Sequence, residues 1–210
     1  KTTFKTNPVI NKFKRGEASV GTWLSLCSSV AGEAMAHIGF DWLLTDAEHA
    51  PWGFDNMVNT FRAVQLGGAV PMARVPWNDT VWIQLTLDAG ALGLFVPMVN
   101  TRADAEGVVS NMRYATKGQR SYGGSRVAAY IEDDYRTWTE ENLAVMVMIE
   151  TVEAVENAEA ILSVDGVVGG YIGPADLALS MGISPSDVGP GTEHEAAILA
   201  VLAACRKTGK

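Results

Sequence analysis

Short apolar segments recur along the chain at fairly regular intervals. Each is almost continuously apolar rather than alternating between apolar and polar positions, which is typical of parallel strands buried on both faces of a sheet. Six strands are therefore predicted, from the segments GTWLSL (21–26), FDWLLTD (40–46), AVPMARV (69–75), GLFVPMV (93–99), AVMVMIE (144–150) and GGYIGPAD (169–176).

The longer segments between these runs have the pattern of helices. Helices are predicted over residues 28–39, 53–68, 78–91, 102–115 and 151–164. Their boundaries carry residues of the kinds that cap or end helices, with Ser28, Asn78 and Thr151 at starts and Gly39, Gly67, Gly68 and Gly90 at ends. Strand and helix thus alternate strictly.

This alternation is compatible with a closed (β/α)8 barrel or with an open doubly wound sheet. No GxGxxG motif follows the first strand, so the dinucleotide-binding signature of the open sheet is missing. Polar residues stand at the ends of at least four strands, at 46–49, Arg74, Glu150 and Asp176. A barrel distributes its active site in this way, so we predict an α/β fold of the (β/α)8 TIM-barrel class.

Length adds a condition to this prediction. A barrel of this class typically takes about 250 residues, whereas the 210 residues end with the sixth crossover helix. A six-stranded open barrel would leave two apolar strand edges unpaired. We therefore expect a single barrel domain over residues 1–210 that is incomplete at its C-terminus, with about two βα units lying beyond the sequence.

Composition narrows the classes of partner and the compartment. A formal net charge of −8 and scattered basic residues argue against a nucleic-acid surface. Cys27 and Cys205, far apart and in apolar settings, are expected to be buried thiols, which fits a reducing cytoplasm. There is no apolar run of the ~18 to 20 residues that span a bilayer, and no apolar region of a secretion signal. A soluble, cytoplasmic protein is expected.

The segment TDAEHAPW (45–52) places Asp46, Glu48 and His49 at the end of one strand. An imidazole beside carboxylates is a natural general base, because the neighbouring carboxylate fixes its tautomer. The alternative is that the histidine caps the following helix.

Two carboxylates follow the fifth and sixth strands, Glu150 in VMIE and Asp176 in YIGPADL. Adjacent parallel strands lie about 4.8 Å apart, so both side chains can reach one ion. Mg²⁺ typically takes one or two protein carboxylates. The alternatives are a charge at a helix N-terminus for Glu150 and a helix cap for Asp176.

Arg74 ends the third strand in MARVPW, in an otherwise apolar environment that disfavours an unpaired cation. It is a candidate clamp for a substrate carboxylate or enolate. An ion pair with Asp46 or Glu48 is the alternative, and both states can alternate. Glycines at 118, 123 and 124, next to Ser125, permit close approach of backbone to a ligand but are weak indications by themselves.

Taken in order, these motifs resemble the HpcH/HpaI family of class II, metal-dependent pyruvate aldolases, which act on 2-dehydro-3-deoxyglucarate or 4-hydroxy-2-oxoheptanedioate. The resemblance runs from about residue 15 to residue 210. The motifs that carry it are GTWLSL, DAEHAPW, ARVPW, LDAGALGLFVPMV, KGQRSYGG, MIET and YIGPADLALSMG. The ordered series is far more specific than any one of them.

The resemblance implies a barrel of the phosphoenolpyruvate/pyruvate-binding type and a divalent metal cofactor, Mg²⁺, Mn²⁺ or Co²⁺. It assigns the metal to Glu150 and Asp176, acid/base chemistry to His49, and the pyruvyl oxygen and enolate to Arg74. It also makes Asp46 and Asp88 supports of the histidine, and backbone around Gly173, Pro174 and Ala175 the lining of the pyruvate carboxylate. The implied reaction is reversible cleavage of a 4-hydroxy-2-oxo acid to pyruvate, or an analogue such as hydroxypyruvate, and an aldehyde.

One departure and two alternatives accompany this expectation. Many relatives carry Gln where this chain has Met148, two residues before the metal-binding Glu. A CoA-ester lyase on a related barrel is one alternative, although an acidic chain is poorly suited to a nucleotide. A non-catalytic barrel kept for assembly or ligand binding is the other. The expected partners are a small 2-oxo acid, an aldehyde and further copies of the chain, as a hexamer made of three dimers.

Overall fold

The computed structural model describes residues 4–129, 131 and 134–210. Within it the chain divides into two compact units, which are treated one at a time below. Unit 1 comprises residues 1–94 and 110–144, and unit 2 comprises residues 95–109 and 145–210. The prediction of a single domain over residues 1–210 stays a prediction.

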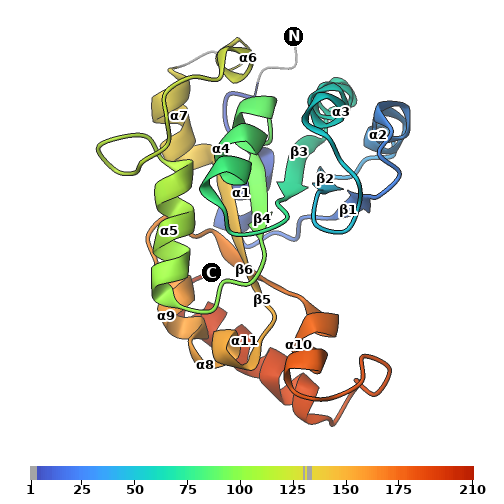
Figure 1. Ribbon diagram of the computed structural model, residues 1–210, viewed down its shortest axis with the longest axis vertical. Helices are drawn as coiled ribbons and strands as arrows, with labels where there is room; N and C mark the ends of the chain where they lie inside the picture. Colours follow the sequence, from blue (N-terminus) through green and yellow to red (C-terminus); the bar gives the residue numbers. More distant parts are fainter. Residues whose placement is uncertain (1–3, 130, 132–133) are drawn as a thin grey trace. The chain divides into compact units, whose positions relative to one another are not determined.

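The sheet has six strands, arranged in chain order from β1 to β6 (Figure 1). The pairings of β1 with β2, of β2 with β3 and of β5 with β6 are parallel, as predicted. The strands are β1 (Gly21–Leu24), β2 (Trp42–Asp46), β3 (Val70–Arg74), β4 (Gly93–Val96), β5 (Ala144–Ile149) and β6 (Gly169–Ile172).

The prediction of a closed eight-stranded barrel is wrong for this chain. Closure requires that the last strand pair with the first, whereas the sheet formed by the described residues runs from β1 at one end to β6 at the other. Burial follows this order, because every residue of β3 and β4 is buried while β1 and β6 are mostly half-buried. The apolar runs predicted the strands and their parallel pairing, but they carry no information on closure.

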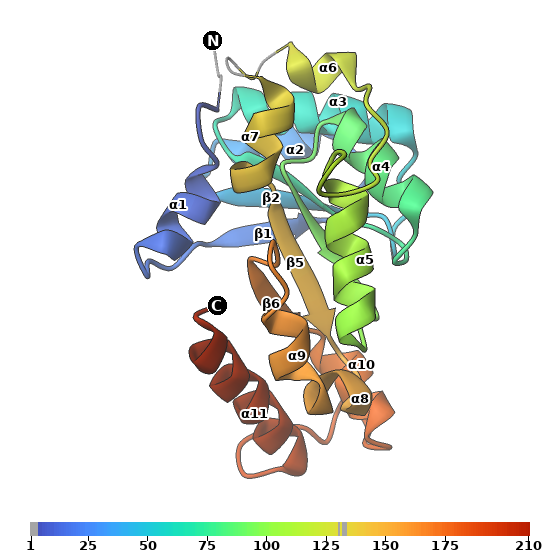
Figure 2. The same ribbon diagram turned by 90° about the vertical axis from the view of Figure 1, so that its left-hand side faces the viewer.

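Helices form in each of the five predicted segments. The helices of the structure are α1 (Pro8–Lys14), α2 (Ser29–Ala36), α3 (Phe54–Leu66), α4 (Thr80–Ala89), α5 (Arg102–Met112), α6 (Ser125–Ala128), α7 (Tyr135–Asn142), α8 (Val152–Glu156), α9 (Ala158–Leu162), α10 (Pro174–Ser180) and α11 (Glu193–Thr208). Of these, α1, α6, α7 and α10 are further helices that lie outside the predicted segments. In unit 1, α2 packs beside α3 (Figure 1). In unit 2, α11 packs beside α9 (Figure 2). In the part of the chain that the structure describes, no helix is long and apolar enough to cross a membrane.

Helix caps explain where several of these helices begin. The side chains of Ser28 and Thr151 accept hydrogen bonds from backbone amides of the first turns of α2 and α8, as predicted. The cap of α4 is Asp79, whose carboxylate accepts two amide hydrogen bonds, and not the predicted Asn78. Asn157 divides the predicted helix 151–164 into α8 and α9.

Asn7 fastens the N-terminal helix of unit 1. Its side chain is fully buried, caps α1 by accepting from the amide of Val9, and donates to the backbone oxygens of Leu92 and Asn142 at 3.0 and 2.9 Å. The backbone amide of Asn7 in turn donates to the side chain of Asn142. One buried amide therefore joins three segments of unit 1 that are distant in sequence.

Candidate active-site residues

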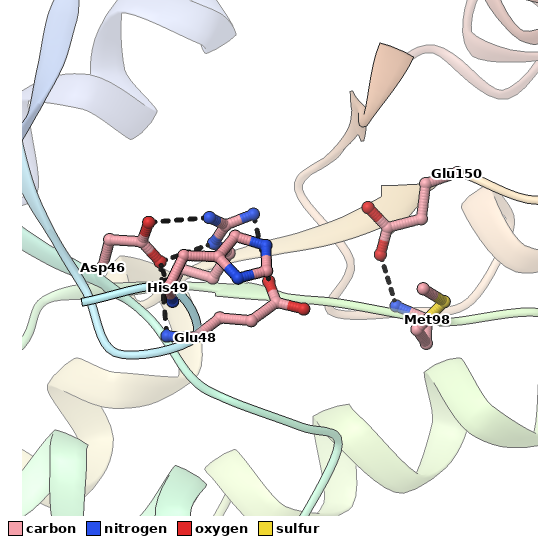
Figure 3. Close-up of polar contacts among 6 residues, drawn as sticks. Asp46, Glu48, His49, Met98 and Glu150 are labelled. Carbon is pink, nitrogen blue, oxygen red and sulfur yellow. Dashed lines mark hydrogen bonds and ion pairs between the residues drawn. The ribbon is translucent and has the colours of Figure 1, made fainter. Parts of the chain in front are cut away.

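Two strand ends of unit 1 bring a carboxylate and a guanidinium together. Asp46 and Arg74 are register partners at the C-terminal ends of β2 and β3. Arg74 donates from Nε to Oδ1 of Asp46 at 2.8 Å and from Nη2 to Oδ2 at 2.7 Å, and both residues are buried (Figure 3). The ion pair that the sequence left open as an alternative for Arg74 is thus observed. Both partners are satisfied in a setting where either alone would be unfavourable.

The turn after β2 is shaped by the same carboxylate. Oδ1 of Asp46 accepts hydrogen bonds from the backbone amides of Glu48 and His49, each at 3.3 Å. The amide of Ala47 donates to the backbone oxygen of Arg74, which extends the parallel ladder by one bond. Asp46 therefore contacts His49 through the backbone of the turn, and the described contacts do not include one between its carboxylate and the imidazole ring.

The carboxylate of Glu48 contacts both Arg74 and the ring of His49. It is the second carboxylate beside Arg74, after that of Asp46. Its Oε2 lies 3.0 Å from Nη1 of Arg74 and 3.9 Å from Nε2 of His49. The side chain of Glu48 is 15% exposed and that of His49 is 63% exposed, so the ring faces solvent while the carboxylate is largely covered. The guanidinium also stacks on Trp23 of β1, with Cζ 4.5 Å from the ring centroid. Trp23 was not singled out from the sequence.

These contacts decide the protonation of Asp46. Burial raises the pKa of its carboxyl. The hydrogen bonds and charge of Arg74, with the backbone amides of His49 and Glu48, lower this pKa by more than burial raises it. The net result is a pKa below the usual range for aspartate. Asp46 is therefore a permanent anion at neutral pH, suited to holding Arg74 rather than to exchanging protons.

Asp88, in the last turn of α4, pairs with a residue that the sequence did not single out. Its Oδ1 lies 2.6 Å from Nη2 of Arg120, whose side chain is fully buried. The guanidinium of Arg120 lies over the rings of Tyr114 and Tyr135, with Cζ 4.7 and 5.3 Å from their centroids, and donates to the hydroxyl of Tyr135. Burial lowers the pKa of Arg120, but Tyr135 and Asp88 raise it more, so the cation is retained.

This pairing bears on the predicted support of His49 by Asp88. Among the described contacts the carboxylate of Asp88 meets Arg120, and none joins it to His49. Gly124, at the start of α6, has φ +75°, and a Cβ there would approach Oδ1 of Asp88 to 2.8 Å. The backbone at this glycine therefore lies close to Asp88, and the close approach of a ligand to it stays a prediction. The support of His49 by Asp88 stays a prediction.

In unit 2, Glu150 directly follows β5 and is 1% exposed. Its Oε1 accepts a hydrogen bond from the backbone amide of Met98 at 2.7 Å, and Met98 has a positive φ of 53° (Figure 3). A side chain at Gly173 would collide with the carboxylate of Glu150. Bare backbone at position 173 is therefore what allows the carboxylate of Glu150 to lie in this buried position.

The remaining predicted residues also belong to unit 2. Gly173 precedes α10, Pro174 begins it, and Asp176 lies in its partly exposed first turn. Met148, the departure from the family pattern, is 2% exposed within β5. Among the described residues, no group of three or more His, Cys, Asp or Glu side chains is arranged to hold a metal. A site here would therefore rely on one or two carboxylates.

The family follows from a comparison of the whole chain. The family model described as HpcH/HpaI aldolase/citrate lyase matches residues 19–210. The chain belongs to the HpcH/HpaI aldolase/citrate lyase family. The resemblance based on the ordered motifs is thereby confirmed.

Individual members of the HpcH/HpaI family match most of the chain. A protein of Rhizorhabdus wittichii named hydroxypyruvate/pyruvate aldolase is 39% identical over 179 residues, covering 85% of this chain and 71% of that protein. A 4-hydroxy-2-oxo-heptane-1,7-dioate aldolase of Klebsiella pneumoniae is 39% identical over 207 residues, covering 97% and 77%. A crystal structure of a family protein from Burkholderia cenocepacia J2315 has 34% identity and a TM-score of 0.89, covering 97% of this chain and 82% of that one. The names of the first two agree with the predicted class, a carbon–carbon lyase.

Proposed function

We propose that the protein is a class II aldolase that reversibly cleaves a 4-hydroxy-2-oxo acid to an aldehyde and pyruvate, or a pyruvate analogue such as hydroxypyruvate. The names of the two aldolase relatives support this reaction class. The observation that carries the proposal is the cluster at the ends of β2 and β3, where Arg74 lies between Asp46 and Glu48, beside His49. It combines a fixed cation with a solvent-facing imidazole.

The two functional groups of this cluster suit different parts of the reaction. His49 takes the proton of the C4 hydroxyl, and the electron pair of the O–H bond forms the aldehyde carbonyl as the C3–C4 bond breaks. The electron pair of that bond becomes the enolate of pyruvate, which is then protonated at C3. Arg74 holds the oxygen on which the negative charge develops, and a cation fixed beforehand stabilises such charge without reorganisation.

A divalent ion is part of the proposal, and the chain offers residues that fit one. Glu150 is a buried carboxylate with bare backbone beside it at Gly173, and Asp176 is a second carboxylate of the same unit. Hard oxygen ligands of this kind suit Mg²⁺, Mn²⁺ or Co²⁺. Such an ion, when bound, supplies Lewis-acid polarisation of the 2-oxo group.

The backbone around Gly173, Pro174 and Ala175 is proposed to line the carboxylate of pyruvate. Ala175 provides an amide N–H group. The amide of Gly173 already donates to the backbone oxygen of Ile149, and Pro174 has no N–H and instead fixes the start of α10. Met148 is too apolar to replace the hydrogen bond of the glutamine that many relatives carry. This substitution is expected to affect affinity for pyruvate more than the type of reaction.

The activity is tested with the purified protein and 4-hydroxy-2-oxoheptanedioate, by coupling pyruvate release to lactate dehydrogenase and NADH oxidation. Cleavage should stop after treatment with a chelator and return on addition of Mg²⁺, Mn²⁺ or Co²⁺. Pyruvate release that is unchanged by the chelator would contradict the proposed metal requirement. The absence of pyruvate release with each of these ions would contradict the proposed aldolase activity. Cleavage of a CoA ester in a parallel assay would favour the lyase alternative.

Two further proposals concern the setting in which the enzyme works. We propose a homo-oligomer, a hexamer made of three dimers, and a cytoplasmic location. Exposed apolar side chains along α4 support assembly, and Cys27 and Cys205, both free thiols in the structure, are compatible with a reducing compartment.

A further inference from the structure

The rim of unit 1 contains a carboxylate to which no part of the reaction has yet been assigned. Oε2 of Glu48 is shared between two partners, Nη1 of Arg74 at 3.0 Å and Nε2 of His49 at 3.9 Å (Figure 3). The first contact is an ion pair. The second is within reach of an ion pair but longer than a hydrogen bond, which requires an N···O distance of about 2.7–3.2 Å.

Two other carboxylates had been expected to support the histidine, and the structure uses them differently. Both oxygens of Asp46 accept from Arg74, and its Oδ1 also accepts the amides of the turn. Oδ1 of Asp88 lies against Arg120. Of these three acidic residues, Glu48 is the one whose carboxylate has a described contact with the ring of His49.

The fold holds Glu48 in this place from two directions. Its backbone amide is bound by Oδ1 of Asp46, and its carboxylate is bound by Arg74, which Asp46 itself fixes. In the described part of the chain, the backbone amide of His49 is hydrogen-bonded to Asp46, while its ring is mostly exposed and makes the longer contact with Glu48. The carboxylate is thus the fixed member of the pair and the imidazole the movable one, so the carboxylate can orient the ring.

We propose that Glu48 is a positioning residue that sets the tautomer of His49 by accepting a hydrogen bond from Nε2. This inference rests on the proposed aldolase function, because it concerns the base of that reaction. The ring closes a gap of under about 1 Å to reach hydrogen-bond distance, a tightening that is common when substrate binds. Nε2 then carries the proton, and Nδ1 is the unprotonated nitrogen that receives the C4 hydroxyl proton.

The charge of the cluster fits this role. Asp46, Glu48 and Arg74 together carry one net negative charge when ionised, so the imidazolium formed after proton transfer is stabilised by an adjacent carboxylate. In Ser-His-Asp hydrolases, a carboxylate likewise holds a histidine in one tautomer and stabilises its charged form. Arg74 keeps Glu48 from turning away to solvent.

The tautomer is measured directly by long-range ¹H–¹⁵N spectra of the imidazole rings at about pH 8, above the ordinary range for imidazole titration. The protein is used with added Mg²⁺, with and without pyruvate, and the His49 signals are assigned by their loss in His49→Asn. We expect protonation at Nε2 in the wild-type protein. Glu48→Met, which removes the carboxylate but keeps an unbranched chain, should abolish that preference. Glu48→Gln, which keeps an acceptor oxygen, should largely restore it.

Kinetics separate this role from a merely structural one. Glu48→Met should lower kcat for cleavage on the order of tenfold or more, a part of the 10²- to 10⁴-fold contribution typical of a general base. KM for the oxo acid and exchange of pyruvate methyl protons with deuterated water should change little, because neither needs proton transfer from the C4 hydroxyl. Glu17→Met is the matched control, since Glu17 pairs with an exposed arginine, Arg15.

Several results would overturn the proposal. Protonation of His49 at Nδ1 in the wild-type protein would do so, as would an unchanged tautomer in Glu48→Met. A parallel loss of methyl exchange and cleavage in Glu48→Met would show that the residue acts through Arg74 alone. The spectra need no turnover, so a protein that lacks aldolase activity but shows the Nε2 preference would refute the proposed function and leave the tautomer assignment standing.

Discussion

Nε and Nη2 of Arg74 donate in parallel to the two carboxylate oxygens of Asp46, which stands opposite it in the register of β2 and β3. Only a guanidinium makes this two-pronged contact, and it leaves Nη1 directed to Glu48. A lysine at this position would satisfy one carboxylate oxygen at a time. The ends of the two strands are thus joined by side chains as well as by the backbone ladder.

Acid should weaken the fold through Asp46. Its pKa is lower in the folded protein than the value of about 3.9 expected in the unfolded chain. The stability it contributes is therefore fully present above the unfolded pKa and is lost as pH falls through the folded pKa. Urea unfolding from about pH 6 down to about pH 3 should bring the free energy of unfolding of the wild-type protein closer to that of Asp46→Asn. If the free energies of unfolding of the wild-type protein and Asp46→Asn differ by the same amount at every pH, Asp46 does not contribute to stability in this way.

His49 and Arg74 should fail differently when each is replaced by alanine. His49→Ala should lower cleavage by about 10²- to 10⁴-fold, while pyruvate still binds and its methyl protons still exchange with deuterated water. Arg74→Ala should reduce pyruvate affinity, methyl exchange and cleavage together, because the enolate loses its cation. Proton NMR of pyruvate in deuterated buffer measures the exchange. Wild-type exchange in Arg74→Ala would remove the enolate-stabilising role from that residue.

Asp176→Ala should abolish both metal binding and cleavage. Two protein carboxylates are proposed to hold the ion, so the loss of one is severe. Titration calorimetry with Mn²⁺ measures the affinity. Glu153→Ala is the matched control, because Glu153 also lies in the first turn of a short helix of the same unit. Equal affinity in wild-type protein and Asp176→Ala would exclude Asp176 as a ligand.

Gly173→Ala should weaken metal binding without unfolding the protein. The new Cβ would collide with the carboxylate of Glu150, which must then move from its present position. We expect a fall in Mn²⁺ affinity of about tenfold or more, as for other changes around a metal ligand. Gly107→Ala is the control, because that glycine has open space around its Cα within α5. If both variants bind Mn²⁺ like the wild-type protein, the bare backbone at Gly173 has no part in the site.

Light scattering after size-exclusion chromatography should give the mass of an oligomer, and a hexamer is proposed. The apolar side chains of Trp77, Val81 and Leu85 are 57%, 60% and 43% exposed on and before α4, and burying them would stabilise an interface. A charge at Val81, as in Val81→Glu, should lower the mass if this face is used. A monomer at micromolar concentration in the wild-type protein would contradict the proposal.

The sequence was most informative where a local pattern determines the structure. The apolar runs ending in Asp46 and Arg74 predicted two neighbouring parallel strands, and the ion pair between them was one of two alternatives for Arg74. Ser28 and Thr151 cap the predicted helices because capping depends on residues within one turn. The order of motifs was sufficient to predict the family.

Features that depend on distant residues were not predicted. Asp88 pairs with Arg120, 32 positions later, and that partner depends on how the loop before α6 folds back onto α4. Whether a sheet closes depends on strand number and stagger together, which no single apolar run encodes. Asp79 takes the cap predicted for Asn78 because both are good caps and the backbone geometry decides between neighbours.

The buried amide of Asn7 imposes an order on the folding of unit 1. Its partners at Leu92 and Asn142 lie 85 and 135 positions along the chain, and a ribosome adds about 5–20 residues per second. Residues near the N-terminus therefore wait several seconds after their own synthesis before the segment that completes their contacts exists. During this interval α1, a helix of seven residues, is too short to be stable alone. Within unit 1, α1 is thus made early but is among the last elements to acquire its native contacts.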